Sequence, residues 1–134
     1  MVADCKQYFK EMHTCAIVPT YNNAGTILMV LTRLQPYIED IFVVNDGSTD
    51  ETPRLLKEVD TEVNVIDYAK NKGKGYALKT GFRVARESIW TSLHFAGFAY
   101  PCRYAVFHAD HAGIPSFIKF FALFFGDFQC FHMH

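Results

Sequence analysis

Two segments of this chain change abruptly from apolar, strand-like residues to polar residues that suit the start of a helix. Residues 15–18 are followed by Pro-Thr-Tyr-Asn-Asn, and residues 41–44 are followed by Asn-Asp-Gly-Ser-Thr. Because parallel strands end at the same edge of a sheet, we expect both polar loops on that edge. In open α/β sheets that edge is where ligands bind. The two junctions therefore predict a parallel sheet with a binding site at its carboxyl edge.

Strands and helices are predicted to alternate through the first 87 residues and to continue into a fourth strand. Apolar residues at helical spacing follow each strand, and another short apolar run follows each helix. This order is typical of right-handed parallel βαβ units, so we expect an α/β fold, a mostly parallel sheet with flanking helices on both faces. The predicted elements are strands at residues 15–18, 41–44, 63–66 and 104–107, and helices at residues 27–34, 53–59 and 76–86.

The polar residues of the two junctions also suit helix caps. Asn22, Asn23 and Thr26 are candidates for the N-cap of the first helix. Ser48, with Glu51 three positions later, has the form of a capping box for the second helix. We interpret Asp50 and Glu51 as first-turn acids that complement the helix dipole, and we place them outside the binding site.

Length and composition restrict the class of protein. The chain has 134 residues, enough for one domain, and its 50% apolar and 20% charged residues are typical of a globular protein. Thirteen Lys and Arg against fourteen Asp and Glu give the chain no net positive charge, so no nucleic acid partner is expected. The four cysteines form no C-x-x-C pair, and the first residues lack a signal peptide's apolar stretch, so we expect a reduced, cytoplasmic setting.

The two junctions, together with Asn-Lys-Gly-Lys-Gly-Tyr-Ala-Leu-Lys-Thr-Gly at residues 71–81, resemble the family 2 glycosyltransferases of the GT-A fold. The resemblance covers about residues 15–87 and implies the Rossmann-like nucleotide-binding half of such an enzyme. In motif it is most similar to enzymes that glycosylate dolichyl or polyprenyl phosphate. It therefore implies a UDP- or GDP-sugar donor, transfer with inversion to a polyprenyl phosphate or glycan acceptor, and peripheral contact with the inner face of a membrane.

The resemblance implies a donor site built from three loops. Tyr21 offers a flat ring and a hydroxyl to the base, and Asp46 can accept paired N–H donors from a uracil or guanine edge. Lys74, between two glycines, suits a diphosphate. Each residue also has a purely structural explanation, in a helix cap, an Asp-Gly turn or a solvated loop. The predicted nucleotide-sugar-binding residues are Pro19, Thr20, Tyr21, Asn23, Val44, Asp46, Gly73 and Lys74.

The glycine-rich loop does not match two other phosphate-binding patterns. A dinucleotide fingerprint needs a third glycine where this chain has Leu78, and a Walker loop needs Gly-Lys-Ser/Thr after four spacers. A nicotinamide-dependent oxidoreductase is therefore disfavoured.

The resemblance also implies a divalent metal ion. Family members carry an Asp-x-Asp motif after the fourth strand, and its acids hold Mg²⁺ or Mn²⁺ against the donor diphosphate. The best counterpart here is His108-Ala-Asp110, in which histidine replaces the first acid. We predict a metal site at Asp110 and His108, with weaker affinity for Mg²⁺ than for Mn²⁺ because imidazole prefers softer ions.

The pattern loosens from Ser88, and the last residues are rich in Phe. Three interpretations stay open for this tail: an edge strand and helix covering the sheet, an amphipathic segment on a membrane surface, or an aberrant end from a truncated or frame-shifted reading frame. We expect one apparently truncated GT-A domain over residues 1–134, with the nucleotide-sugar-binding half at 15–110 and the tail at 111–134.

The family's acceptor platform and catalytic base have no counterpart after Asp110, so the catalytic residues stay unassigned. A non-catalytic nucleotide-binding remnant, or a subunit that depends on a partner chain, is the alternative function.

Overall fold

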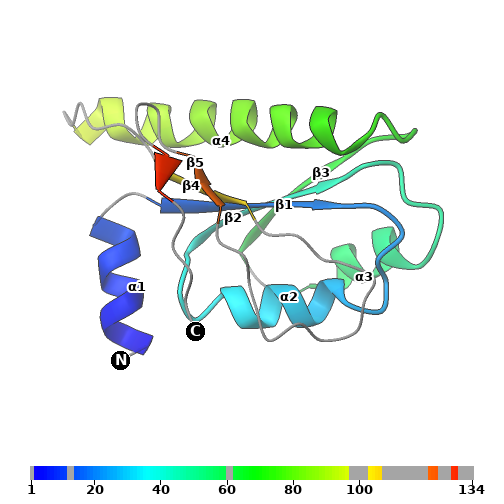
Figure 1. Ribbon diagram of the computed structural model, residues 1–134, viewed down its shortest axis with the longest axis horizontal. Helices are drawn as coiled ribbons and strands as arrows, with labels where there is room; N and C mark the ends of the chain where they lie inside the picture. Colours follow the sequence, from blue (N-terminus) through cyan, green and yellow to red (C-terminus); the bar gives the residue numbers. More distant parts are fainter. Residues whose placement is uncertain are drawn as a thin grey trace.

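Helices and strands alternate along the chain, as Figure 1 shows. The computed structural model describes residues 2–11, 14–59, 62–96, 103–106, 121–123 and 128–129. The helices are α1 (Val2–Glu11), α2 (Ile27–Leu34), α3 (Thr52–Glu58) and α4 (Lys74–Ala96). The strands are β1 (Thr14–Thr20), β2 (Asp40–Asn45), β3 (Val63–Asp67), β4 (Arg103–Val106), β5 (Phe121–Leu123) and β6 (Phe128–Gln129).

The described strands form one sheet in the order β3-β2-β1-β4-β5-β6. The first four are mutually parallel, and β5 and β6 are antiparallel to their neighbours. The predicted mostly parallel α/β sheet is therefore confirmed. The register aligns the carboxyl ends of β1, β2 and β3, because Thr20 pairs with Asn45 and Asn45 pairs with Asp67. Three polar residues thus end neighbouring strands at the same level.

The helices cover both faces of the sheet. In Figure 1, α2 and α3 lie below the sheet and α4 lies above it. Strand order reverses between β1 and β4, since β2 and β3 lie on one side of β1 and β4 lies on the other. This reversal is a topological switch point, where the connecting loops diverge and leave room for a ligand.

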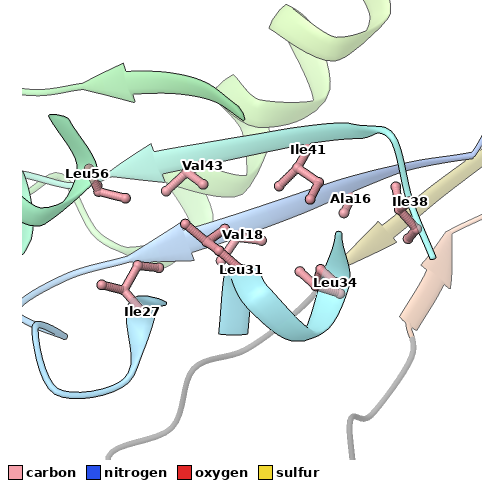
Figure 2. Packing of buried hydrophobic residues seen from close by; sticks show 9 residues of the cluster. All are labelled: Ala16, Val18, Ile27, Leu31, Leu34, Ile38, Ile41, Val43 and Leu56. Carbon is pink, nitrogen blue, oxygen red and sulfur yellow. The ribbon is translucent and has the colours of Figure 1, made fainter. Parts of the chain in front are cut away.

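Apolar side chains on both faces of β1 and β2 explain their continuous apolar runs. Ala16 and Val18 belong to the larger cluster, on the side of α2, whereas Cys15 and Ile17 pack toward α4. The larger cluster, drawn in Figure 2, contains Ala16, Val18, Ile27, Leu31, Leu34, Ile38, Ile41, Val43 and Leu56. On the other face, the predicted inward residues of α4 are buried or half-buried, namely Ala77, Leu78, Phe82 and Ala85.

Helix α4 lies very close to the sheet at Gly81. A Cβ at this position would be 2.5 Å from Cγ2 of Ile17 and 3.2 Å from Cγ2 of Val44. A larger side chain would therefore push α4 away from β1 and β2.

Some predicted boundaries are wrong. Strand β1 continues through Pro19 to Thr20, where the sequence predicted an end before the proline. Helix α4 begins at Lys74 and runs to Ala96, although the apolar periodicity predicted a helix over residues 76–86. The longer helix needs no clean amphipathic pattern, because helix propensity and backbone hydrogen bonds can extend an element that packing has started.

The capping-box prediction is also wrong. Helix α3 begins at Thr52 with Glu51 as N-cap, and the side chain of Glu51 makes no capping hydrogen bond. The N-cap of α2 is Thr26, one of the three predicted candidates, although its side chain makes no capping hydrogen bond. Within the tail, β5 and β6 pair antiparallel beside β4, which agrees with the edge-strand part of the first interpretation.

We predict that Gly81→Ala destabilises the fold by about 1–3 kcal/mol, because the added methyl group meets the buried side chain of Ile17. Gained helix propensity offsets at most about 1 kcal/mol of this loss. The matched control is Gly75→Ala, which lies in the same helix and whose added methyl group would have no atom within 4 Å. Urea unfolding checks both variants, and equal stability of the two would contradict the close-packing argument.

Candidate functional site

Three loops leave the carboxyl edge of the sheet, on the right of Figure 1. They follow β1, β2 and β3, and they carry the polar residues of the sequence motifs. Hydrogen bonds among the loops, rather than apolar packing, determine the shape of this edge.

Three consecutive backbone amides join the first loop to the second. Each donates to a side-chain oxygen, so Ser48, which was predicted to cap a helix, instead holds the neighbouring loop. The pairs, donor first, are Asn22 N to Ser48 Oγ (2.9 Å), Asn23 N to Thr52 Oγ1 (2.9 Å) and Ala24 N to Asp50 Oδ2 (3.1 Å).

Asn22 completes this link in the opposite direction. Its Oδ1 accepts the backbone N–H groups of Thr49 (2.8 Å) and Asp50 (3.3 Å). Its φ of 48° lies in the left-handed region, which asparagine tolerates better than most residues. Asn22 therefore shapes the turn between β1 and α2.

Asp50 is a bridge between the loops, a role that the sequence interpretation missed. Its Oδ1 accepts the N–H of Thr52 at 2.9 Å, while Oδ2 accepts from Ala24. Burial raises the pKa of the Asp50 carboxyl, but hydrogen bonds from Thr52, Ala24 and its own backbone together lower the pKa below its ordinary value. The ionised carboxylate is therefore the form that stabilises the loop pair.

Asp46 joins the second loop to the third. The residue is 3% exposed, its N–H donates to Thr20 O at 2.9 Å, and its Oδ1 accepts the N–H of Lys72 at 2.8 Å. Within the described residues no donor approaches Oδ2. One oxygen of a buried carboxylate thus fixes the third loop, and the other can accept from a ligand.

The backbones of the second and third loops also touch at Gly47. This glycine has φ +71°, and a Cβ there would lie 2.3 Å from Asn71 N and 2.4 Å from the carbonyl carbon of Lys70. No other residue could occupy this position without moving the third loop.

Asn45 and Thr20 complete the edge. Asn45 donates from Nδ2 to Asp67 Oδ1 at 2.8 Å, and its carbonyl accepts the N–H of Tyr68 at 3.0 Å. Thr20 is 4% exposed, and its Oγ1 is buried without a partner among the described residues. An unpaired buried hydroxyl costs about 1–3 kcal/mol, so this group suits a polar atom of a ligand.

The other predicted site residues lie at the same edge in different environments. Pro19 and Val44 are buried and pair in register, while Asn23 is buried and accepts from Thr26 through its side chain and backbone. Tyr21 is 44% exposed.

The remaining predicted residues are those of the glycine-rich loop and the predicted metal ligands. Gly73 has φ +89° with open space around its α-carbon, and Lys74 is exposed at the first position of α4. His108 and Asp110 lie outside the described residues. Within the described part of the chain, no three His, Cys, Asp or Glu side chains gather closely enough to hold a metal ion.

A further cluster escaped the sequence analysis. Nζ of Lys72 lies 5.2 Å from the ring centroid of Tyr68 and 4.7 Å from that of Tyr76. The one signal of this cluster in the sequence is a tyrosine four residues before the lysine and another four residues after it. That spacing predicts a shared face only within a helix, and Tyr68 precedes the helix.

Residues 15–93, more than half of the chain, match the family model described as Glycosyl transferase family 2. The chain belongs to this family. It is similar to the dolichyl-phosphate beta-glucosyltransferase of Saccharomyces cerevisiae, with 30% identity over 54% of this chain and 26% of the relative. It is also similar to the UDP-N-acetylglucosamine–dolichyl-phosphate N-acetylglucosaminyltransferase of Methanococcus voltae, with 33% identity over 53% of this chain and 35% of the relative. The chain thus spans about a quarter to a third of these relatives.

Solved structures show the same fold. The glucosyl-3-phosphoglycerate synthase of Mycobacterium tuberculosis in complex with UDP has a TM-score of 0.52 and 19% identity, over 82% of this chain and 38% of that protein. The same enzyme with Mn²⁺ and UDP-glucose has a TM-score of 0.51. The predicted GT-A fold is confirmed by this likeness. Among the described helices, none has both the length and the hydropathy of a membrane-spanning segment.

We predict that Gly47→Ala destabilises the protein by at least about 1 kcal/mol more than Gly73→Ala. Both variants incur the cost of left-handed φ, about 1–2 kcal/mol, but the new methyl group at position 47 also collides with the backbone of the third loop. Chemical unfolding of the two variants measures the difference. Equal losses would mean that the loops are free to separate.

We also predict that Asp50 makes the loop pair sensitive to acid. Its pKa is lowered in the folded protein, so its contribution is present above the unfolded pKa of about 4 and is lost as the pH falls through the lower folded value. Unfolding free energies of wild type and Asp50→Asn should therefore converge between about pH 5 and pH 2. A constant difference across this range would contradict the assignment.

Proposed function

We propose that this chain binds a nucleotide-diphospho-sugar at the carboxyl edge of the sheet, as the donor-binding part of an inverting glycosyltransferase. The observation that carries the proposal is the carboxylate of Asp46, which is buried, held through Oδ1 by Lys72, and without a described donor at Oδ2. A uracil or guanine base presents the ring N–H that Oδ2 can accept. UDP is bound by the structural neighbour from M. tuberculosis, which supports this choice of ligand.

We assign the binding of the rest of the donor to the neighbouring residues. The exposed ring of Tyr21 offers a stacking surface to the base, and the unpaired hydroxyl of Thr20 offers a hydrogen bond. Gly73 and Lys74 stand at the amino end of α4, where backbone N–H groups and positive charge favour a diphosphate. The floor of this donor site, and the turn beneath the nucleoside, are formed by Pro19, Asn23 and Val44.

The transfer itself needs an acceptor and a general base. We assign the binding site of the acceptor, and the base, to parts of the enzyme beyond the described residues. Two relatives are named for dolichyl phosphate, so we propose a polyprenyl phosphate acceptor, presented at the cytoplasmic face of a membrane. An acceptor oxygen that attacks the anomeric carbon opposite the departing nucleoside diphosphate inverts its configuration.

We further propose that Asp110 and His108, which lie outside the described part of the chain, hold Mn²⁺ or Mg²⁺. Mn²⁺ accompanies UDP-glucose in the M. tuberculosis enzyme, which supports a divalent ion here. Such an ion offsets the charge of the departing diphosphate when bound.

We predict that Asp46→Ala and Asp46→Asn both weaken the binding of UDP or GDP by about tenfold, or about 1.4 kcal/mol. Asparagine can keep the acceptor for the N–H of Lys72, but it turns an NH₂ group toward the ring N–H of the base. Calorimetric titration with UDP and GDP, each with and without Mn²⁺, measures the effect.

The paired variants separate a ligand contact from a structural one. If Asp46 only held the third loop, Asp46→Asn would bind like wild type while Asp46→Ala would not. Absence of binding of both nucleotides to wild type would overturn the proposed function. Binding to wild type without any release of sugar from UDP- or GDP-sugars would favour the alternative, a nucleotide-binding chain that does not catalyse transfer alone.

A further inference from the structure

Strand β3 ends the described sheet, and no described strand pairs with its outer side. The N–H of Tyr68, directly after the strand, donates to Asn45 O on β2. In a parallel pair, alternate residues direct their N–H and C=O groups to the same side, so every second residue before Tyr68 also faces β2. The residues whose backbone groups point away from the sheet are therefore Val63, Val65 and Asp67.

This outer side lacks the features that usually prevent an edge strand from pairing. Such strands are commonly protected by lysine, by proline or by a bulge. Strand β3 reads Val-Asn-Val-Ile-Asp, without Lys or Pro, and its register with β2 runs without a bulge. Its central residue, Val65, is apolar and 36% exposed. The outer side of β3 therefore suits the addition of another strand.

Opposite charges lie at the two ends of β3. Glu62, directly before the strand, lines a cleft of about 620 Å³ together with Asp40 and with Glu39, which is paired with lysines of α1. Lys70 follows the other end and is exposed. Within the described residues, no ion pair involves Glu62 or Lys70. A strand of this length is about 17 Å long, so the two side chains do not meet within one chain.

We propose that β3 pairs antiparallel with β3 of a second copy of this chain, about a two-fold axis at Val65. In this register Val65 lies opposite its own counterpart, and Val63 lies opposite Asp67 of the second copy. These pairs join residues whose backbone groups point outward, so each outward N–H and C=O of both strands gains a partner. A contact between two identical edges closes at two copies.

Charge complementarity makes a second copy the occupant that this edge favours. In the antiparallel register Glu62 lies opposite Tyr68 of the second copy, and Lys70 of that copy follows two residues later, within reach of a long side chain. Symmetry repeats this contact at the other end of the interface. A parallel pairing would instead bring the two acidic ends together and the two basic ends together, which repel.

The first test is sedimentation equilibrium of the full chain over a range of concentrations, with circular dichroism to confirm that each variant folds. Wild type should show a monomer–dimer equilibrium. Val65→Lys places like charges opposite each other on the axis and should raise the dissociation constant by about tenfold or more. The matched control is Leu28→Lys, which adds the same charge at a similarly exposed apolar residue of α2 and should leave the constant unchanged.

Charge reversal tests the direction of the pairing. Glu62→Lys alone, or Lys70→Glu alone, places like charges together at both ends of the interface, so each variant should be a monomer where wild type is a dimer. A mixture of the two variants should form a heterodimer, because each contact then joins opposite charges. Misfolding of either variant would not produce association in the mixture alone.

Three results would overturn the proposal. They are a wild type that stays monomeric up to about 1 mM, a dimer that Val65→Lys does not weaken, and single charge variants that fail to associate when mixed. The residues of this interface are not among the predicted donor-binding residues, so nucleotide binding is tested separately and either proposal can fail alone.

Discussion

The contact between Gly47 and the backbone of residues 70–71 is the constraint on which the candidate site depends. A Cβ at position 47 would lie 2.3 Å from Asn71 N, so the third loop can approach the second only because a glycine is there. That approach brings the N–H of Lys72 within 2.8 Å of Asp46. The site is thereby assembled before a ligand arrives, which lowers the entropy that binding must overcome.

The sheet explains why these loops meet at all. The register aligns the ends of β1, β2 and β3, and α4 crosses to the face opposite α2 and α3 (Figure 1). The loops of the first two junctions therefore stand together beside the switch point. Burial of apolar residues on both faces keeps this geometry, since a shift of α4 is resisted at Gly81 by the side chain of Ile17.

The α/β fold and the three loops could be predicted from the sequence, because they depend on local apolar runs and short motifs. The bridging contact of Ser48 could not, since its oxygen accepts from the backbone of Asn22, a residue 26 positions away. Nor could the cluster around Lys72, whose tyrosines come from a strand end and a helix start. Local patterns are compatible with several tertiary partners, and only the packed sheet selects among them. The roles of the predicted donor-binding residues stay predictions.

The most direct test is a titration of the isotopically labelled protein with UDP, followed by backbone amide chemical shifts. If the carboxyl edge binds the nucleotide, the largest changes will fall on the three loops, with Thr20, Asp46 and Lys72 among them. Amides at the opposite edge, such as those of Asp40 and Val63 at the starts of β2 and β3, should stay unchanged. Changes concentrated at that opposite edge, or none at saturating UDP, would contradict a donor site built on Asp46.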